Sequence, residues 1–222
     1  MSSIQICPSI LNADRANLPH EISRIASDAD WLHLDVMDAK FVPAFTFDFN
    51  ECAKIIADST LMVDAHLMIS NPDDVAPEYA AVGAKSVTFH LEASTTPSQT
   101  LKAIRKTGSR SGIAIKPDTP VVELFEFMDY ADMFLIMTVE PGAGGQSFMR
   151  DMMPKVRVLR DLISQNKGQQ WIQVDGGITL DTILEARLAG ANAFVAGSAV
   201  FRADDPGHMV QALRERAMSA QL

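Results

Sequence analysis

Trp31-Leu32-His33-Leu34-Asp35-Val36-Met37-Asp38 has the pattern of a buried β-strand, and the expected architecture of the chain follows from it. Successive side chains of a strand point to opposite faces, so His33, Asp35 and Met37 share one face and the residues between them form an apolar face. The apolar face predicts a covering helix, as in parallel sheets. Burying a histidine and a carboxylate without partners costs folding free energy. The face with His33 and Asp35 is therefore expected to bind a metal ion or a substrate, or to form a His–Asp hydrogen bond.

Strand-like apolar segments alternate with helix-like segments along the whole sequence. Strands are expected at residues 4–10, 31–37, 61–68, 86–90, 112–116, 133–138, 171–175 and 193–196. Helices are expected at residues 12–27, 49–57, 73–82, 98–107, 121–128, 149–165, 180–189 and 206–217. Eight strand–helix units predict an α/β protein with a TIM (β/α)8 barrel, forming one catalytic domain over residues 1–222. A doubly wound open sheet is the alternative, disfavoured because the first strand lacks a G-x-G-x-x-G turn.

The composition is that of an ordinary globular protein, with 47% hydrophobic residues among 222. A formal net charge of −9 argues against non-specific binding of nucleic acid. Cys7 and Cys52 are too few for a disulfide framework and fit a reducing compartment. The sequence shows neither a signal peptide nor an apolar window of membrane-spanning length. We therefore expect a cytoplasmic protein with no nucleic-acid or membrane partner.

Possible metal ligands lie where the active site of a TIM barrel is found, at the carboxyl ends of the strands. These are His33, Asp35, His66 and Asp175. Two imidazoles and two carboxylates suit one divalent transition metal, such as zinc, iron, manganese or cobalt. Each residue alone would also fit a structural hydrogen bond, so it is their joint position that predicts a metal site.

Glycine-rich turns follow the last three expected strands. Backbone N–H groups in such turns approach an anion closely, and phosphate sites recur near the last strands of this fold. One Gly-Gly pair alone would indicate an ordinary tight turn, but three turns in adjacent units favour phosphate binding. The residues concerned are Gly142, Ala143, Gly144 and Gly145, then Gly176 and Gly177, then Gly197 and Ser198.

Other features near the strand ends have more than one interpretation. Lys116 either forms a Schiff base with a carbonyl substrate or pairs with Glu92 or Glu140. The unusually apolar loop at residues 38–48 is a lid, a subunit contact or packing on the barrel rim. Three methionines are either core filler or a dry floor of the site: Met37, Met68 and Met137.

Seven segments occur in an order that is typical of one known family. They are Pro8-Ser9-Ile10-Leu11, His33-Leu34-Asp35-Val36-Met37-Asp38, Phe41-Val42-Pro43, His66-Leu67-Met68, Glu140-Pro141-Gly142-Ala143-Gly144-Gly145-Gln146-Ser147-Phe148, Val174-Asp175-Gly176-Gly177-Ile178 and Ala196-Gly197-Ser198-Ala199. In this order they resemble the ribulose-phosphate 3-epimerase family. No single segment is decisive, but the ordered set is highly specific and covers the chain from end to end.

The resemblance implies an isomerase of the pentose phosphate pathway that interconverts D-ribulose 5-phosphate and D-xylulose 5-phosphate and forms homo-oligomers. It implies that His33, Asp35, His66 and Asp175 bind the metal, with Asp35 as proton acceptor and Asp175 as proton donor. Ser9 and His66 would contact substrate, and the three glycine turns, with Asp175, would bind phosphate and substrate.

The chain departs from the family at Ala39, Ala44 and Ala143, where Gly, Asn and Phe are usual. These changes alter the rim of the site and its expected substrate preference, and leave every expected ligand in place.

Epimerisation beside a ketone removes a proton from one face of a carbon and returns a proton to the other face. Two carboxylates on opposite sides of that carbon suit this task, and a divalent cation would stabilise the enediolate as it forms. Three alternatives remain open at this point. They are an allulose-6-phosphate 3-epimerase with the same site, a lyase or aldolase that depends on Lys116, and a non-catalytic phosphosugar-binding protein.

Overall fold

The computed structural model describes residues 4–220 and contains one sheet of eight parallel strands in the order β1-β8-β7-β6-β5-β4-β3-β2. A parallel bridge between Ser9 and His33 links β1 to β2, so the sheet is a nearly closed barrel, and the predicted (β/α)8 fold is confirmed. The strands are β1 (Gln5–Pro8), β2 (Leu32–Met37), β3 (Val63–Met68), β4 (Ser86–His90), β5 (Arg110–Ile115), β6 (Met133–Met137), β7 (Trp171–Asp175) and β8 (Ala193–Ala196).

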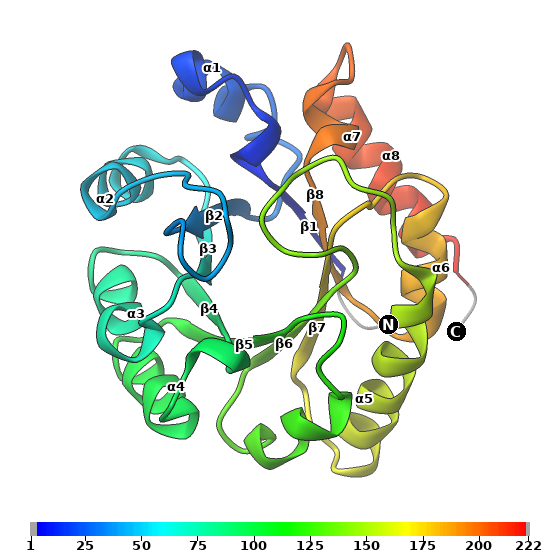
Figure 1. The fold of residues 1–222 in the computed structure, drawn as a ribbon. Helices are drawn as coiled ribbons and strands as arrows, with labels where there is room; N and C mark the ends of the chain where they lie inside the picture. Colours follow the sequence, from blue (N-terminus) through cyan, green and yellow to red (C-terminus); the bar gives the residue numbers. More distant parts are fainter. Residues whose placement is uncertain (1–3, 221–222) are drawn as a thin grey trace.

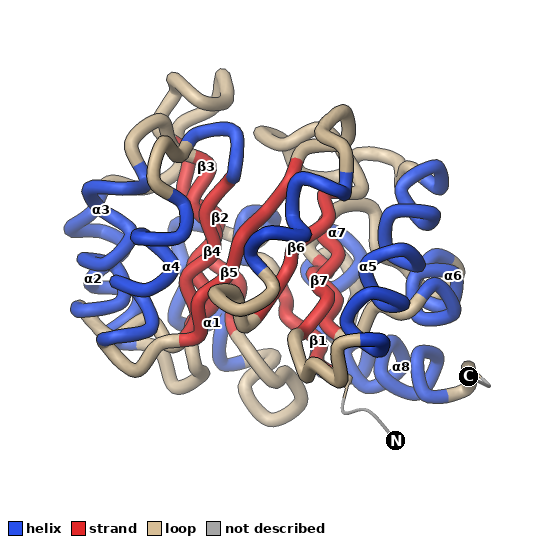
Figure 2. Tube along the Cα trace, turned by 90° about the horizontal axis from the view of Figure 1, so that it is seen from below, coloured by secondary structure: helices blue, strands red, loops and turns tan. Residues whose placement is uncertain are grey.

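Helices surround the strands when the barrel is viewed along its axis (Figure 1), and they flank the strands in the view turned by 90° (Figure 2). The α-helices are α1 (Leu18–Ser23), α2 (Phe49–Asp58), α3 (Pro72–Ala81), α4 (Pro97–Lys106), α5 (Met153–Gln165), α6 (Thr182–Ala189), α7 (Ser198–Phe201) and α8 (Pro206–Met218). Short 3-10 helices are η1 (Ile10–Asn12), η2 (Arg15–Asn17), η3 (Leu91–Ala93), η4 (Val121–Phe127) and η5 (Arg150–Met152).

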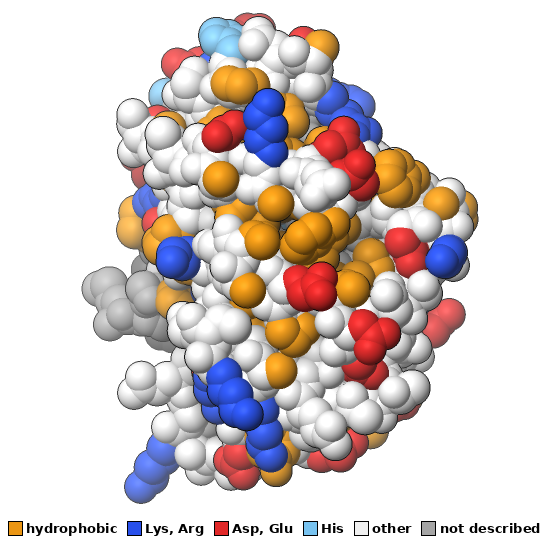
Figure 3. Space-filling view, turned by 90° about the vertical axis from the view of Figure 1, so that its left-hand side faces the viewer, with side chains coloured by type: hydrophobic (Ala, Val, Ile, Leu, Met, Phe, Trp, Pro, Cys, Tyr) orange, Lys and Arg blue, Asp and Glu red, His pale blue; other side chains and the backbone are white. Residues whose placement is uncertain are grey.

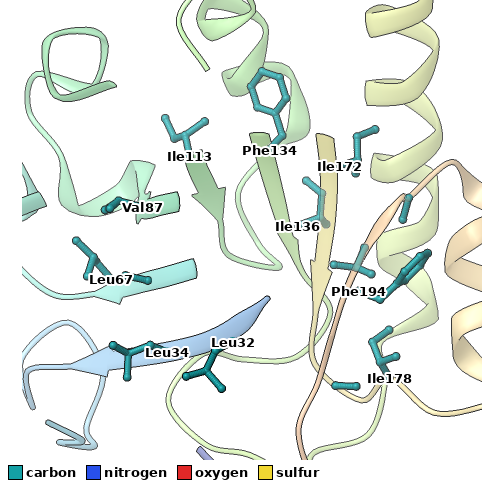
Figure 4. Packing of buried hydrophobic residues seen from close by; sticks show 14 of the residues in the cluster. Leu32, Leu34, Leu67, Val87, Ile113, Phe134, Ile136, Ile172, Ile178 and Phe194 are labelled. Carbon is teal, nitrogen blue, oxygen red and sulfur yellow. The ribbon is translucent and has the colours of Figure 1, made fainter. Parts of the chain in front are cut away.

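The main hydrophobic core lies between the barrel and its helices (Figure 4). Leu32 and Leu34 of β2 are fully buried in it, as are Phe134 of β6 and Phe194 of β8. Full burial of one such side chain contributes ~1.5–3 kcal/mol to folding. Since a shift of one residue would turn these side chains to the other face, this burial also fixes the polar face of β2 toward the barrel axis.

Residues 12–27 do not form the single helix that the sequence predicted. The segment contains the end of η1, then η2, and α1 begins only at Leu18. Pro19 lies in the first turn of α1, where proline is tolerated, and it could not occupy the interior of a longer helix without breaking it. Before it, Asp14 accepts a hydrogen bond from the backbone N–H of Ala16 at 3.0 Å, a local bond that competes with helix.

The predicted helix at residues 121–128 is also different, because it is the 3-10 helix η4. Its β-branched and aromatic residues have low helix propensity. One helix start and one helix end lie close to the expected bounds. α3 begins at Pro72, one residue before the expected start, and α6 ends at the expected residue, Ala189, followed by Gly190 with a φ of +112°.

The loop at residues 38–48 packs on the rim of the barrel. Asp38 accepts hydrogen bonds from the backbone N–H groups of Lys40 and Phe41, both at 2.9 Å. Val42 is buried against Met37 and Met68 at the strand ends. This part of the loop therefore packs on the rim, while Phe45 in the same loop is 58% exposed; the lid and the subunit contact stay predictions.

Hydrophobic side chains gather on the side of the molecule that carries α1, α2 and α3 (Figure 3). A groove between α1 and α2 is lined by Leu18, Ile22, Phe47 and Ile55. Within residues 4–220, no helix has both the length and the apolar character needed to cross a membrane.

Candidate active site

Side chains from three strands converge at one end of the barrel. His33 and Asp35 belong to β2, His66 to β3, and Asp175 ends β7. His33 Nε2 lies 3.4 Å from Asp35 Oδ1 and 3.8 Å from Asp175 Oδ2. His66 Nδ1 lies 3.2 Å and 3.3 Å from the same two oxygens. The structure thus brings together the four side chains that the sequence predicted as metal ligands.

The spacing of these four atoms fits a divalent cation. Ligand atoms ~2.1 Å from a tetrahedral ion lie ~3.4 Å from one another. The four N···O distances of 3.2–3.8 Å are close to that value, and all four atoms lie within 4.8 Å of one another. His33 Nε2 is buried and has no hydrogen-bond partner among the described residues, so it is an orphaned polar atom at the position where a cation would lie.

The electrostatics of the site favour positive charge where these atoms meet. Burial lowers the pKa of His33, but Asp35 and Asp64 outweigh burial and raise it well above its usual value. The pKa of His66 is also raised, because Asp175 and Asp35 outweigh the effect of burial. Burial raises the pKa of Asp35, but His33 and His66 outweigh it and hold that pKa far below its usual value. An ionised Asp35 therefore faces the two imidazoles.

His33 is held from behind by Asp64, a carboxylate to which the sequence analysis assigned no role. Asp64 lies beside His33 in the register of β2 and β3, and it accepts a hydrogen bond from His33 Nδ1 at 3.0 Å. Gln173 Nε2 donates to the same oxygen at 2.7 Å, and Arg110 lies 3.8 Å from the other oxygen. Because a carboxylate accepts the Nδ1 proton, Nε2 of His33 is left to face the site.

His66 is held by a different chain of side chains. Its Nε2 lies 3.0 Å from Nε2 of His90, and Nδ1 of His90 lies 3.2 Å from Oε2 of Glu92. Burial lowers the pKa of the His90 imidazole to about 4, so this ring is neutral. From the sequence, His90 had no expected role, and Glu92 was expected only as a candidate partner of Lys116.

A cavity opens at these strand ends, and many predicted substrate contacts line it. His33 and His66 are fully buried beneath it. Asn12 and Gln146 also line the cavity, although the sequence analysis assigned them no role there. The predicted residues that line it are Ser9, Asp35, Met37, Met68, Met137, Gly142, Ala143, Gly144, Gly145, Asp175, Gly176, Gly177, Gly197 and Ser198.

The glycine turns pack tightly against their neighbours around this cavity. Gly177 has a φ of +67°, and a Cβ atom there would lie 2.5 Å from the backbone nitrogen of Phe148. A Cβ atom at Gly197 would lie 2.4 Å from Oδ1 of Asn12. Gln146 Nε2 donates to the backbone oxygen of Ala143 at 2.8 Å and so braces the loop from within. Glycine is therefore needed at positions 177 and 197, because a side chain there would collide with its neighbours.

Lys116 does not line this cavity. Its ammonium lies 3.9 Å from the centre of the Phe41 ring, and its backbone N–H donates to Glu92 Oε1 at 2.7 Å. Among the described residues, neither Glu92 nor Glu140 forms an ion pair with the ammonium. The structure therefore shows neither of the two roles predicted for the Lys116 side chain.

An eight-stranded barrel with a histidine–aspartate cluster at its strand ends has the architecture of a (β/α)8-barrel enzyme. The model of the ribulose-phosphate 3 epimerase family matches residues 5–201. The ribulose-phosphate 3-epimerase of Mycobacterium leprae is 47% identical over 212 residues, which is 96% of this chain and 94% of the relative. The cytoplasmic isoform of Oryza sativa subsp. japonica is 41% identical over 225 residues, 99% of this chain and 97% of the relative. The chain belongs to the ribulose-phosphate 3-epimerase family.

Solved structures with lower identity share the fold. KGPDC from Streptococcus mutans has a TM-score of 0.72 at 14% identity and covers 97% of both chains. The 3-hexulose-6-phosphate synthase from Salmonella typhimurium has a TM-score of 0.71 at 17% identity and covers 98% of this chain and 100% of its own. These similarities show the barrel fold alone.

Proposed function

We propose that this protein interconverts D-ribulose 5-phosphate and D-xylulose 5-phosphate by moving a proton at C3. The observation that carries the proposal is the pair of carboxylates, Asp35 and Asp175, which line one cavity from two different strands. The family to which the chain belongs supports the same reaction.

In the proposed reaction, Asp35 accepts the C3 proton of ribulose 5-phosphate and Asp175 returns a proton to the opposite face. Asp35 is oriented for this role, because its Oδ2 accepts a hydrogen bond from Ser9 Oγ while Oδ1 faces the imidazoles. The Asp175 side chain is 15% exposed, compared with 4% for Asp35, so Asp175 exchanges protons with water more readily. The two carboxylates exchange roles in the reverse direction.

His33, Asp35, His66 and Asp175 would hold one divalent transition metal ion, with zinc, iron, manganese and cobalt all suited to these ligands. When bound, this ion supplies Lewis-acid stabilisation of the negative charge that forms as the C3 proton leaves. Ser9 lines the cavity and would contact the substrate. The substrate contact expected of His66 is not supported by the lining of the cavity, because His66 is fully buried beneath it. The three methionines that line the cavity limit the access of water to the carboxylates.

The glycine turns bind the phosphate group through their backbone N–H groups. They lie on the same cavity as the carboxylates, and no side chain at Gly177 or Gly197 stands between their backbone and a bound anion. A phosphate anchored there holds C3 between Asp35 and Asp175, which lowers the entropic part of the barrier.

Three further expectations belong to this proposal. The chain would act as one catalytic domain over residues 1–222 and as a homo-oligomer. A cytoplasmic location is proposed from the sequence features above, and the relative from rice is named a cytoplasmic isoform.

The proposal is tested by measuring metal content and epimerase activity before and after chelation. We expect about one equivalent of transition metal, loss of activity on chelation, and recovery when metal is returned. Full activity without metal would contradict the metal site. Bound metal with faster turnover of allulose 6-phosphate than of ribulose 5-phosphate would contradict the assigned substrate.

A further inference from the structure

We propose that Glu92, acting through His90, determines which ring nitrogen of His66 presents its lone pair to the metal position. Glu92 and His90 are then positioning residues, since neither lines the substrate cavity. This inference rests on the proposed function, because it gives the metal ligand His66 its required tautomer.

The chain of contacts runs from the centre of the barrel to its surface. His66 and His90 are fully buried, and their ring centroids lie 5.1 Å apart with 28° between the ring planes. Glu92 ends the chain with a side chain that is 22% exposed. Each link is within hydrogen-bond distance, 3.0 Å between the two Nε2 atoms and 3.2 Å from His90 Nδ1 to Glu92 Oε2.

Which group donates in each of these hydrogen bonds follows from the protons that each side chain carries. An ionised carboxylate only accepts, so the ring proton of His90 lies on Nδ1 and is donated to Glu92. The 3.0 Å contact between the two Nε2 atoms needs one donor and one acceptor, so Nε2 of His90, whose proton lies on Nδ1, accepts. His66 donates from its own Nε2, and when the site holds a metal ion its Nδ1 is left as the lone pair that faces the ion. That atom is the one that lies 3.2 Å from Asp35 and 3.3 Å from Asp175.

The surroundings keep Glu92 ionised and fix the position of its carboxylate. Its Oε1 accepts from the backbone N–H of Lys116 at 2.7 Å and from the hydroxyl of Thr119. A backbone N–H cannot reverse its role, so any group at this position must present an oxygen to Lys116. The carboxylate meets this requirement and still offers a second oxygen to His90.

Glu92→Gln keeps the size and shape of the side chain but should reverse the hydrogen bonds that connect it to His90 and His66. The amide oxygen of glutamine must face the N–H of Lys116, which turns the NH2 group toward Nδ1 of His90. His90 would then accept at Nδ1 and donate from Nε2, and the proton of His66 would move to the nitrogen that faces the metal. Glu92→Ala leaves room for water, which can accept from His90 and keeps the original direction.

The test measures metal affinity by competition with a chelating dye, using the apoprotein and zinc or cobalt. Loss of an outer hydrogen-bond partner of a ligating histidine costs ~10–100-fold in affinity. We expect a loss of this size for Glu92→Gln and a smaller loss for Glu92→Ala. Thr119→Val is the matched control, because it removes a hydrogen bond to the same carboxylate and leaves the contacts among Glu92, His90 and His66 in place. We expect this variant to bind metal like the unsubstituted protein.

A second readout does not depend on any variant. In zinc-loaded protein labelled with 15N at histidine, we expect the ring proton of His90 on Nδ1, and a proton on Nε2 would overturn the inference. Affinity of Glu92→Gln within twofold of the unsubstituted protein would also overturn it while leaving the metal-dependent function intact. An unsubstituted protein that binds no divalent metal would overturn both.

Discussion

Replacing Asp64 by Asn should destabilise the protein strongly, although Asp64 neither lines the cavity nor counts among the proposed ligands. Asp64 is fully buried and accepts hydrogen bonds from His33 and Gln173. Its second oxygen lies 3.8 Å from Arg110, a guanidinium that is only 10% exposed. The substitution keeps the shape of the side chain and removes its charge, which leaves Arg110 in the barrel without its buried counter-charge.

The magnitude follows from this burial. Removing one partner of a buried ion pair costs ~3–5 kcal/mol. We expect about 3 kcal/mol for Asp64→Asn, the low end of that range, because the amide oxygen still accepts one hydrogen bond. A change of this size lowers Tm by ~6–12 °C in a protein of this length.

Denaturant unfolding and thermal unfolding of the metal-free protein measure this change. Glu185→Gln is the control, because the Arg150–Glu185 pair is 62% and 39% exposed, and such a pair contributes less than ~1 kcal/mol. If the free energy of unfolding of Asp64→Asn lies within about 1 kcal/mol of that of the unsubstituted protein, the buried charge of Asp64 is not compensated by Arg110 and His33 as described. The double variant with Arg110→Met should be less destabilised than the sum of its parts.

The pH dependence of the same difference gives an independent check. Burial raises the pKa of Asp64, but His33 and Arg110 outweigh it and hold that pKa well below its usual value. The unfolded chain therefore binds more protons than the folded protein below ~pH 4, so this contribution to stability is present above that pH and lost as the pH falls through the folded-state pKa. The part of the stability difference that comes from the Asp64 carboxylate should therefore shrink as the pH falls below ~4.

Three other substitutions test separate parts of the structure. Ala39 has a φ of +57°, so Ala39→Gly should raise the free energy of unfolding by up to ~1 kcal/mol in denaturant, and a loss of stability would contradict strain at this residue. Gly177→Ala would press a Cβ atom onto the backbone of Phe148, so the KM for ribulose 5-phosphate should rise at least tenfold, and an unchanged KM would argue against a phosphate turn here. Ser9→Ala removes the hydrogen bond to Asp35, and a hydrogen bond to a charged group is worth ~1.5–3 kcal/mol. We therefore expect kcat to fall ~10–100-fold with metal content unchanged, and a normal kcat would show that Ser9 does not orient Asp35.

The strands and the faces of their side chains could be predicted from the sequence, because apolar alternation determines both. His33 and Asp35 lie opposite Leu32 and Leu34, whose burial against the helices admits one orientation of β2. The convergence of His33, Asp35, His66 and Asp175 follows from the same pattern, since parallel strands bring their carboxyl ends together. The short 3-10 helices were not predictable in this way, because local side chain to backbone bonds and Pro19 decide them.

The side chains that hold His33 and His66 from outside the site could not be predicted from the alternation of apolar and polar residues. Asp64 lies two residues before His66 on the same strand face, a signal that was available. Its contact with His33 depends on the register of β2 against β3. The contact between His66 and His90 depends on side-chain rotamers, and Glu92 reaches His90 only because η3 turns the chain directly after β4.

Hydrogen exchange at C3 tests the central claim most directly, namely that Asp35 and Asp175 each serve one face of the same carbon. The measurement follows ribulose 5-phosphate by NMR in D2O with Asp175→Asn protein whose metal content is checked, beside the unsubstituted protein. We expect deuterium to enter C3 of ribulose 5-phosphate through Asp35 while xylulose 5-phosphate forms at less than ~1% of the normal rate, since general acid–base catalysis contributes ~100–10,000-fold. Near-normal formation of xylulose 5-phosphate by this metal-loaded variant would contradict the two-carboxylate mechanism.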